Sequence, residues 1–439
     1  MYRINRNDEL TIKKISKYIE HNTTEVARRE MLMDYYKGKS KILSKTYDDP
    51  TKPCNRIVNP YAQYITDIAT AYFLGNPVQY RSVNEDLEDA YRDICAYNDE
   101  AAENVALAKN ASICGESYEL LWLDSDGNIR FKALDPLKAI PIYDDTLEEE
   151  LVYFIRYYDD EDIETGNKTT FIEVYTDKEI RKYKNTVGNI QLLEIVPHPF
   201  KAVPIVVFKN NDELIGDFET VLSLIDAYDS TISGELDDMS YFTDAYLALY
   251  GMMGTEEDDI KAMKKNRVLL MDENAKAEWL TKNVNDSHEA NVKNIIDEAI
   301  HKFSTVPNMS DANFAANSSG VAIRYKLLGL ENKTSKKESA FKKGLQRRIE
   351  IICQYLYILG STYDFRDIEI IFTRNLPNDI NEIASVLNQV GHLLSEETQL
   401  SLLPIDVDYS AEQERKRRER EEGYDEYYIG DDSQGDING

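Results

Sequence analysis

The stretch that decides the fold runs from Pro307 to Ile358 and begins Pro307-Asn308-Met309-Ser310-Asp311-Ala312-Asn313-Phe314-Ala315-Ala316-Asn317-Ser318-Ser319-Gly320. This first part is rich in Asn, Ser, Asp and Gly, which favour loops. The part that follows has no proline before Pro377 and carries apolar residues three or four positions apart: Phe341, Leu345, Ile349, Ile352 and Leu356. The pattern predicts a polar loop that leads into a very long helix, an unusual combination for an enzyme core.

The composition is that of a folded and strongly acidic chain. Hydrophobic residues make up 42% and aromatic residues 10% of 439 residues, a length that suggests roughly two to four domains. The 51 Lys and Arg against 80 Asp and Glu give a formal net charge of −29. DNA-binding modules usually have a basic surface, because release of phosphate counterions drives their affinity. The charge therefore excludes tight DNA binding by the chain as a whole.

The cysteines and the N-terminus predict a soluble protein made in a reducing cytoplasm. Cys54, Cys95, Cys114 and Cys353 form no CxxC pair, so we expect neither a disulfide framework nor a zinc site. The first eight residues lack the apolar core of a signal peptide. The longest apolar run, near residues 205–208, is too short to span a bilayer.

The first 214 residues combine helices with strands. We expect two helices over 9–45 with a break near Asn22-Thr23-Thr24, a third over 55–74, and two more over 84–97 and 99–113. From Gly115 the apolar period changes to two, which predicts seven strands: Ser117–Leu123, Ile129–Leu134, Ala139–Ile142, Leu151–Tyr158, Thr169–Tyr175, Glu179–Lys184 and Ile190–Ile195.

A long helical pattern then extends over residues 218–250. Its apolar residues alternate three and four apart, as in a seam that packs on other helices, and such a helix would be roughly 50 Å long. The opposite face carries five carboxylates, Asp226, Asp229, Glu235, Asp237 and Asp238, which we interpret as a solvated face.

A compact α/β insert follows, with a charged helix near 255–265 and strands Arg267–Met271 and Ala277–Leu280. A second helix over 288–304 completes an antiparallel pair that would hold this insert away from the main body.

The C-terminal part is mainly helical. The pattern predicts a strand over Ile368–Phe372, a helix over 379–394, a short helix capped by Ser395, and a solvated charged helix over 411–422. The acidic, Gly-rich stretch 430–439 is expected to be disordered.

The motifs of common enzymes are missing from the sequence. No phosphate-binding GxxxxGK[ST], GxGxxG, HExxH, GxSxG or CxxC occurs, and the five histidines are scattered. We therefore predict no catalytic residue, metal site or cofactor. Two alternatives stay open, a metal-dependent nucleic-acid enzyme hidden among the carboxylates and a capsid-associated scaffold.

Several short segments, in order along the chain, resemble one family. They are 34–39 (DYYKGK), 55–59 (NRIVN), 72–78 (YFLGNPV), 115–118 (GESY), 307–311 (PNMSD) with Phe314, 317–322 (NSSGVA), 327–331 (LLGLE in the order Leu327-Leu328-Gly329-Leu330-Glu331), 372–377 (FTRNLP) and 394–398 (LSEET). Each is weak alone, but their order and spacing resemble the portal (connector) proteins of tailed double-stranded-DNA bacteriophages, in the siphovirus-type branch.

The resemblance implies an α+β subunit with several domains. Its parts would be a wing over 1–214 together with 321–376, a first stem helix over 215–251, a clip over 252–287, a second stem helix over 288–306, a tunnel loop over 307–320, a long wing helix over 321–360, a crown over 377–429 and a disordered tail over 430–439.

The resemblance also implies a non-enzymatic function and a set of partners. Portal subunits form a ring, usually of twelve copies, at one vertex of the capsid in the virion, after assembly in the host bacterial cytoplasm. Double-stranded DNA passes through the ring without sequence specificity during packaging and ejection. Expected partners are the terminase large subunit, a head-completion or adaptor protein, and the major capsid and scaffolding proteins, with no membrane.

Three groups of candidate site residues follow. The tunnel loop would place Asp311, Phe314, Asn317, Ser318, Ser319 and Gly320 near DNA, although Ala315 and Ala316 stand where the family often has glycine. The basic cluster Lys333, Lys336, Lys337, Lys342 and Lys343 would contact DNA or pair with acidic residues across subunit interfaces, and we favour the second. The clip residues Lys261, Lys264, Lys265 and Arg267 would be solvated or would dock a partner.

The acidic stem suggests how such a channel would work. Like charge on the stem would keep the duplex centred, at an energy that salt screens within about 10 Å. Asn317, Ser318 and Ser319 would offer weak phosphate contacts without sequence preference.

Overall fold

The computed structural model describes residues 2–6, 8–50, 52–161, 163, 166–186, 189–242, 246–250, 256, 258–259, 261, 276–280, 286–310, 320–375, 387–389, 391–401 and 412–419. The chain divides into two compact units. The first comprises residues 1–309 and 327–375, and the second comprises residues 310–326 and 376–439.

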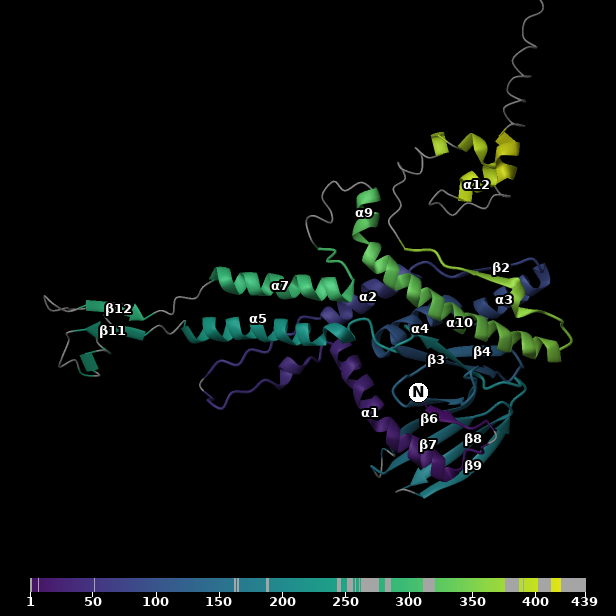
Figure 1. The fold of residues 1–439 in the computed structure, drawn as a ribbon, viewed down its shortest axis with the longest axis horizontal. Coiled ribbons are helices and arrows are strands. Elements are labelled where there is room, and N and C mark those ends of the chain that lie inside the picture. The colour runs from purple at the N-terminus through teal and green to yellow at the C-terminus, as the bar shows by residue number, and fades with distance from the viewer. Residues whose placement is uncertain are drawn as a thin grey trace, which may run out of the picture. The chain divides into compact units, whose positions relative to one another are not determined.

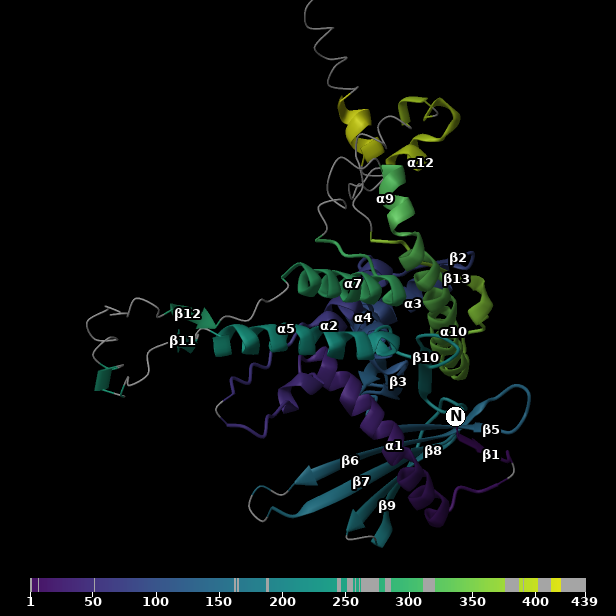
Figure 2. The ribbon, with the colours of Figure 1, turned by 60° about the vertical axis from the view of Figure 1, so that its left-hand side comes forward.

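A six-stranded sheet with helix α1 against it forms one part of the first unit (Figure 2). The strand order is β1-β5-β6-β7-β8-β9, and only β1 and β5 pair in parallel. The strands are β1 (Tyr2–Ile4), β5 (Ala139–Asp144), β6 (Leu151–Glu161), β7 (Lys168–Tyr175), β8 (Glu179–Thr186) and β9 (Asn189–Pro197). Helix α1 (Ile12–Tyr36) buries Ile15 in an apolar cluster with Ile140, Ile155 and Ile172 of the sheet.

Helix α1 is continuous, so the predicted break near Asn22-Thr23-Thr24 is wrong. Asn22 is buried, accepts a hydrogen bond from Tyr2 and donates one to the hydroxyl of Tyr157 in the sheet. The hydroxyl of Thr23 donates to the carbonyl of Glu20 within the helix. Tertiary contacts therefore override the low helix propensity of these residues.

A second sheet, β10-β3-β4, packs with the longest helix, α10, around the main core (Figure 1). The elements of this part are α2 (Tyr61–Leu74), β2 (Gln79–Ser82), α3 (Glu85–Tyr97), α4 (Glu100–Cys114), β3 (Glu116–Leu123), β4 (Ile129–Leu134), β10 (Ile205–Lys209), α10 (Leu328–Ile358) and β13 (Ile368–Ile371), which pairs with β2. Phe73, Phe208 and Phe341 meet in the core. A Cβ at Gly344 would lie 2.5 Å from Cδ1 of Phe208, so this glycine lets α10 approach β10 closely.

All seven strands predicted from alternation are confirmed, and each begins within one residue of its predicted start. Helices α3 and α4 and strand β13 are confirmed as well. Strands β1 and β2 are too short, at three and four residues, to show a period. Strand β10 is apolar on both sides and shows no alternation, so it was not predicted.

Arg348 of α10 is fully buried in an ion network that joins three elements. Its guanidinium donates to both carboxylate oxygens of Glu119 on β3, at 2.7 Å each. It also donates to Glu100 and Asn104 on α4, at 3.0 and 2.8 Å. Arg348 and Glu119 are both inaccessible to solvent, so each charge depends on the other for compensation.

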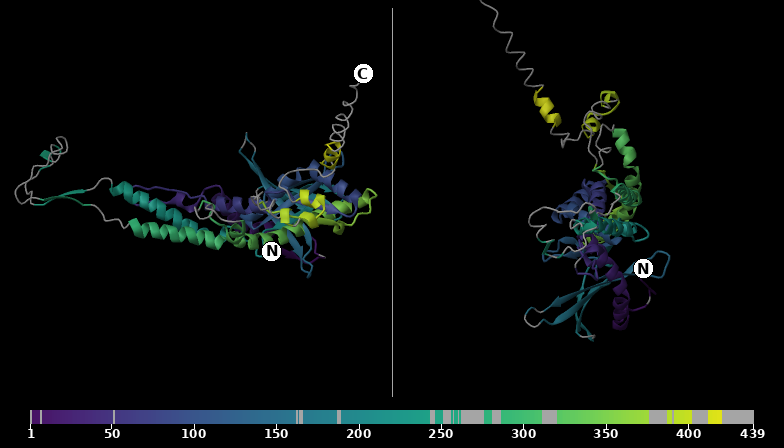
Figure 3. Two further views of the ribbon diagram at one scale, coloured as in Figure 1. Left: turned by 90° about the horizontal axis from the view of Figure 1, so that it is seen from above. Right: turned by 90° about the vertical axis from the view of Figure 1, so that its left-hand side faces the viewer.

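Helices α5 (Leu222–Phe242) and α7 (Asp286–Ser304) lie side by side, with the hairpin of β11 (Tyr246–Tyr250) and β12 (Lys276–Leu280) beyond their ends (Figures 1 and 3). The prediction of one helix to residue 250 is wrong, because the chain leaves the helix after Phe242. The apolar run at 246–250 fits helical and strand spacing equally well, and pairing with β12 decides between them. The predicted strand Ala277–Leu280 is confirmed, whereas Arg267–Met271 lies outside the described residues.

Two other helices differ from their predicted bounds. The helix expected from residue 55 begins at Tyr61, after an extended segment that ends in Pro60. The helix expected over 321–360 is interrupted at Leu327, between α9 (Gly320–Lys326) and α10. Gly329 in the first turn of α10 weakens helical continuity at this point.

In the second unit the structure describes α9, a short turn of 3₁₀-helix (Gly391–Leu393), α12 (Glu396–Ser401) and a helical segment over 412–419. The hydroxyl of Ser395 accepts from the amide of Thr398, which confirms the predicted cap. Lys416 and Gln413 of the last segment contact Glu396.

We predict that Arg348→Ala lowers the free energy of unfolding by about 3–5 kcal/mol, because it leaves Glu119 and Glu100 buried without their cation. Urea unfolding followed by circular dichroism measures this effect. The neighbour Arg347 provides the control, since it pairs with Glu350 at a partly exposed site, and Arg347→Ala should cost less than about 1 kcal/mol. Equal losses for the two variants would show that the buried network adds no special stability.

Candidate functional site: the helical pair and its base

A segment with little regular structure lies along one face of α5. We call residues 41–60 the strap; it begins with a turn of 3₁₀-helix (Lys41–Ser44), and residue 51 is not described. Alternate residues of the strap donate backbone N–H groups to side chains of α5: Asn55 to Asp237 at 2.5 Å, Ile57 to Ser233 at 2.9 Å and Asn59 to Asp229 at 2.8 Å.

The periods of the two segments explain this match. Side chains four residues apart on a helix are separated by about 6 Å along its axis, and alternate residues of an extended chain are separated by about 6.6 Å. Asp229, Ser233 and Asp237 therefore present acceptors at nearly the spacing of the donors in the strap. Antiparallel directions of the two segments complete the alignment.

The contacts correct our interpretation of the acidic α5 face as solvated. Asp229 is inaccessible to solvent and also accepts from Ser40, and Asp237 accepts from Lys45 and Tyr47. Asp226 accepts from Tyr35, and burial together with this hydrogen bond raises the pKa of Tyr35 to about 12. Three carboxylates of α5, those of Asp226, Asp229 and Asp237, thus bind the N-terminal part of the same chain.

Polar and aromatic contacts also connect α5 to α7. Lys293 donates to Glu235 at 2.7 Å. The ring of Tyr61, at the start of α2, packs edge-on against Tyr228 of α5, and its hydroxyl donates to Asp297 of α7. Tyr61 therefore holds both helices on the side where the strap lies.

The base of the helical pair is a buried cluster around Asp217, just before α5. Lys337 of α10 donates to its carboxylate at 2.5 Å, and Ser112 of α4 donates to the same oxygen. Lys333 lies 3.3 Å from the other carboxylate oxygen. The ammonium of Lys333 also donates to the carbonyls of Asp217 and of Ser304, the last residue of α7, at 3.0 Å each. One lysine of α10 therefore connects the bases of both helices.

The charges of this cluster control its protonation. Burial alone would raise the pKa of Asp217, but the charges of Lys337 and Lys333 and the hydrogen bonds from Lys337 and Ser112 hold that pKa below its usual value. Asp217 therefore stays ionised at neutral pH.

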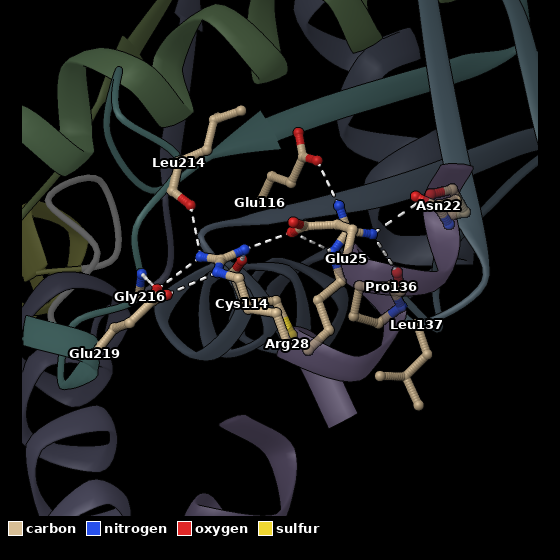
Figure 4. Close-up of polar contacts among 12 residues, drawn as sticks. Asn22, Glu25, Arg28, Cys114, Glu116, Pro136, Leu137, Leu214, Gly216 and Glu219 are labelled. Atoms are coloured by element: carbon tan, nitrogen blue, oxygen red, sulfur yellow. Dashed lines mark hydrogen bonds and ion pairs between the residues drawn. The ribbon is translucent and has the colours of Figure 1, made fainter. Parts of the chain in front are cut away.

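A second polar network ties α1 to the loop that leads into α5 (Figure 4). Arg28 donates to both carboxylate oxygens of Glu219, at 2.7 and 2.6 Å, and to the carbonyl of Leu214 at 3.0 Å. Arg29 donates to Glu116 at 2.7 Å. A cavity of about 340 Å³ lies beside these residues, and their mutual pairing fixes the path of the chain into the helical pair.

The expected tunnel loop can be placed only at its ends. Asp311, Phe314, Asn317, Ser318 and Ser319 lie outside the described residues, and Gly320 begins α9. On the N-terminal side, the hydroxyl of Tyr64 donates to the carbonyl of Pro307 at 3.0 Å and accepts from the amide of Met309 at 2.8 Å. His301 contacts the carbonyl of Val306 through Nδ1 at 2.9 Å.

The five lysines of the basic cluster have different environments. Lys337 is buried and Lys333 partly buried, and both bind Asp217 of their own chain. For Lys337 this corrects our expectation of contact with DNA or a neighbouring subunit, since its ammonium is already enclosed. Lys336 and Lys343 are exposed and Lys342 is partly exposed. Their role at an interface or on DNA stays a prediction.

The clip candidates are mostly beyond the described ranges. Lys264, Lys265 and Arg267 are not described, and exposed Lys261 lies 3.6 Å from Asp258. In the part of the chain that the structure describes, no three His, Cys, Asp or Glu side chains gather as a metal site. No helix in these ranges has the length and apolarity needed to cross a membrane.

Sequence reasoning missed the residues at the base of the helical pair. Asp217 is one carboxylate among 80 acidic residues, and its partners on α10 follow more than 110 positions later. The only local signal was the pair Lys333 and Lys337, four residues apart on the long helix. That spacing places both on one face, but it does not identify the acid that they bind.

We predict that Asp229→Ala releases the strap from α5, because Asn59 and Ser40 lose their acceptor. Limited proteolysis within 45–56 should become at least several-fold faster, while the six-stranded sheet stays folded. The adjacent residue of α5, Ser230, is exposed and gives the control, and Ser230→Ala should leave cleavage unchanged. Equal protection in both variants would contradict the role of Asp229.

The Asp217 cluster predicts a pH dependence of stability. Because the folded pKa of Asp217 lies below the unfolded value of about 3.9, its contribution is full above that value and is lost as the pH falls through the folded pKa. Asp217→Asn should therefore reduce stability at pH 7 by a few kcal/mol, and the difference from the native chain should shrink at pH 3 and below. Exposed Asp212 supplies the control variant Asp212→Asn, and a pH-independent difference for Asp217→Asn would refute the prediction.

Comparisons with known proteins identify the family to which the chain belongs. Residues 15–424 match the family described as "Phage portal protein, SPP1 Gp6-like". The chain is 26% identical over 404 residues to the portal protein of Clostridium phage phiCD119, covering 84% of this chain and 88% of that protein. It is 26% identical over 437 residues to the portal protein of Bacillus phage SPP1, covering 94% and 84%. Because the match extends over nearly the whole chain, this protein belongs to the phage portal protein family.

Proposed function

We propose that this chain is the portal subunit of a tailed bacteriophage, and that copies of it form a ring at one vertex of the capsid. The observation that carries the proposal is the family match over residues 15–424. The pairing of α5 with α7, which a small hairpin connects along the chain, supports it, because this is the stem-and-clip arrangement that the resemblance implies for such a subunit. Twelve copies are the expected number.

The ring is proposed to conduct double-stranded DNA during packaging and ejection and to retain the packaged genome. Terminase would dock at the hairpin end during packaging, and an adaptor protein would replace it there. The capsid and scaffolding proteins would contact the wing. The virion is the proposed location, following assembly in the bacterial cytoplasm, and the proposal assigns the chain no catalytic activity.

The charge distribution modifies our expectation for the channel. Glu235 and Asp237 are neutralised by Lys293 and Lys45, so these two stem carboxylates contribute little repulsion. The net charge of −29 on the whole subunit still repels the duplex within a Debye length of about 10 Å. We propose that DNA slides because it is repelled weakly and without sequence preference by the charge of the whole subunit. Repulsion by a row of stem carboxylates would contribute less.

Deleting the gene in the phage or prophage genome that encodes this chain tests the proposal. We expect heads without nuclease-protected DNA, because terminase would have no vertex through which to package. Complementation with the native gene should restore protected DNA and a ring visible at a single vertex by cryo-electron microscopy. Rings released from such heads should have about twelve times the subunit mass of 50.6 kDa.

Two results would contradict the proposal. One is DNA-filled heads from the deleted genome at the native yield. The other is a chain that remains a monomer in assembled heads, as a decorating scaffold protein would.

A further inference from the structure

One face of α7 carries apolar side chains that are strongly exposed. Ile295 and Phe303 are 57% and 61% exposed, and Ala299 lies between them, partly exposed. The three residues are four positions apart, so they form one row along the helix, which we call the α7 stripe. Exposed apolar rows of this kind mark interaction surfaces on folded proteins.

The α7 stripe points away from the strap. Asp297 and His301 of α7 face Tyr61, through a hydrogen bond to Asp297 and an edge-on ring contact with His301. Each residue of the stripe is two positions away from Asp297 or His301. Two positions correspond to about 200° around a helix, so the stripe lies on the opposite face. The strap leads directly into Tyr61 and binds α5 on that same side. The stripe and the strap therefore lie on opposite sides of the helical pair.

The strap has an apolar outer surface of its own. Leu43, Tyr47 and Ile57 are 46%, 42% and 36% exposed, although Ile57 binds α5 through its backbone amide and Tyr47 through its hydroxyl. These side chains are therefore available to a partner while the strap stays in place.

Charge complements the apolar surfaces. The strap carries three exposed cations, Lys41, Lys52 and Arg56, and two exposed acids, Asp48 and Asp49, so its exposed charge is slightly positive within a chain of net charge −29. Beside the α7 stripe, Glu298 is exposed. The cation at that end, Lys302, lies over the ring of its neighbour Phe303, 5.6 Å from the centroid. Both surfaces thus combine exposed apolar residues with charges, and a cation of the strap can pair with Glu298 of the facing copy.

We propose that the α7 stripe of one copy packs against the strap of the next copy, an inference that rests on the proposed ring. Two different surfaces on opposite sides of one subunit make a head-to-tail contact, and repetition of this contact closes a ring when the rotation allows it. We favour a second copy of the chain as the partner, because one contact, repeated from copy to copy, covers both the α7 stripe and the strap of every subunit. The strap, held by Asp229 and Asp237, is then an assembly surface as well as a cover for α5.

Cysteine cross-linking tests the contact. In a Cys54→Ser background, Ile57→Cys is combined with Ala299→Cys, and Tyr47→Cys with Ile295→Cys, because Tyr47 lies further from the base of the helical pair than Ile57, as Ile295 does relative to Ala299. Oxidation of assembled rings should give a ladder of covalent multimers on a denaturing gel, because each contact would link one copy to the next. The four variants with one introduced cysteine are the controls and should give no ladder, since each lacks its facing thiol.

A disruption experiment gives an independent measure. Ile295→Asp with Phe303→Asp should weaken ring assembly by about tenfold or more, since each change removes apolar area from the contact. The thermal midpoint of the unassembled chain should stay unchanged, because both side chains are exposed there. Val83, which follows β2 and is 93% exposed, gives the matched control Val83→Asp, which should assemble normally.

The outcomes separate this inference from the proposed function. Two results would overturn the strap contact and leave the portal function intact. One is that rings of native size form but neither cysteine pair gives a ladder, and the other is that the double aspartate variant assembles normally. A native chain that forms no ring in assembled heads would refute the proposed function, and this inference with it.

Discussion

The structure depends on a buried ion cluster that fixes where the helical pair begins. Asp217 is held between Lys333 and Lys337 of α10, and Lys333 also binds the carbonyl that ends α7. Removing these charges from water is costly, and only complete pairing compensates that cost. The geometry is therefore tightly restricted, because a shift of α5, α7 or α10 would leave a charge unpaired.

The acidity of the chain serves two separate purposes. A minority of the carboxylates, including Asp217, Asp229 and Glu119, are buried and bind cations or amides of the same chain. The remaining acids give the surface its negative charge. The sequence shows only the net charge, which does not distinguish the buried carboxylates from the exposed ones. An interpretation of α5 from its charge alone consequently assigned to solvent the residues that bind the strap.

The fold was predictable where neighbouring residues in the sequence determine the secondary structure. Alternation located seven strands, and the order of short segments indicated the family. The end of α5 at Phe242 was not predictable, since Tyr246 and Leu249 fit a helix as well as a strand. Asn22 was interpreted as a break because its partners Tyr2 and Tyr157 are distant in sequence. The site was harder still, because the acid that binds Lys333 and Lys337 can be identified only in three dimensions.

The strap has a consequence for how the chain folds during synthesis. Its hydrogen bonds to α5 connect residues 170 to 192 positions apart, so the strap leaves the ribosome long before its acceptors exist. Until then its amides must remain bonded to water, and the N-terminal helices can mature without it. Contacts between such distant residues form slowly, which makes attachment of the strap a late step in folding. Newly made subunits would thus complete their assembly surface only after most of the chain has been translated.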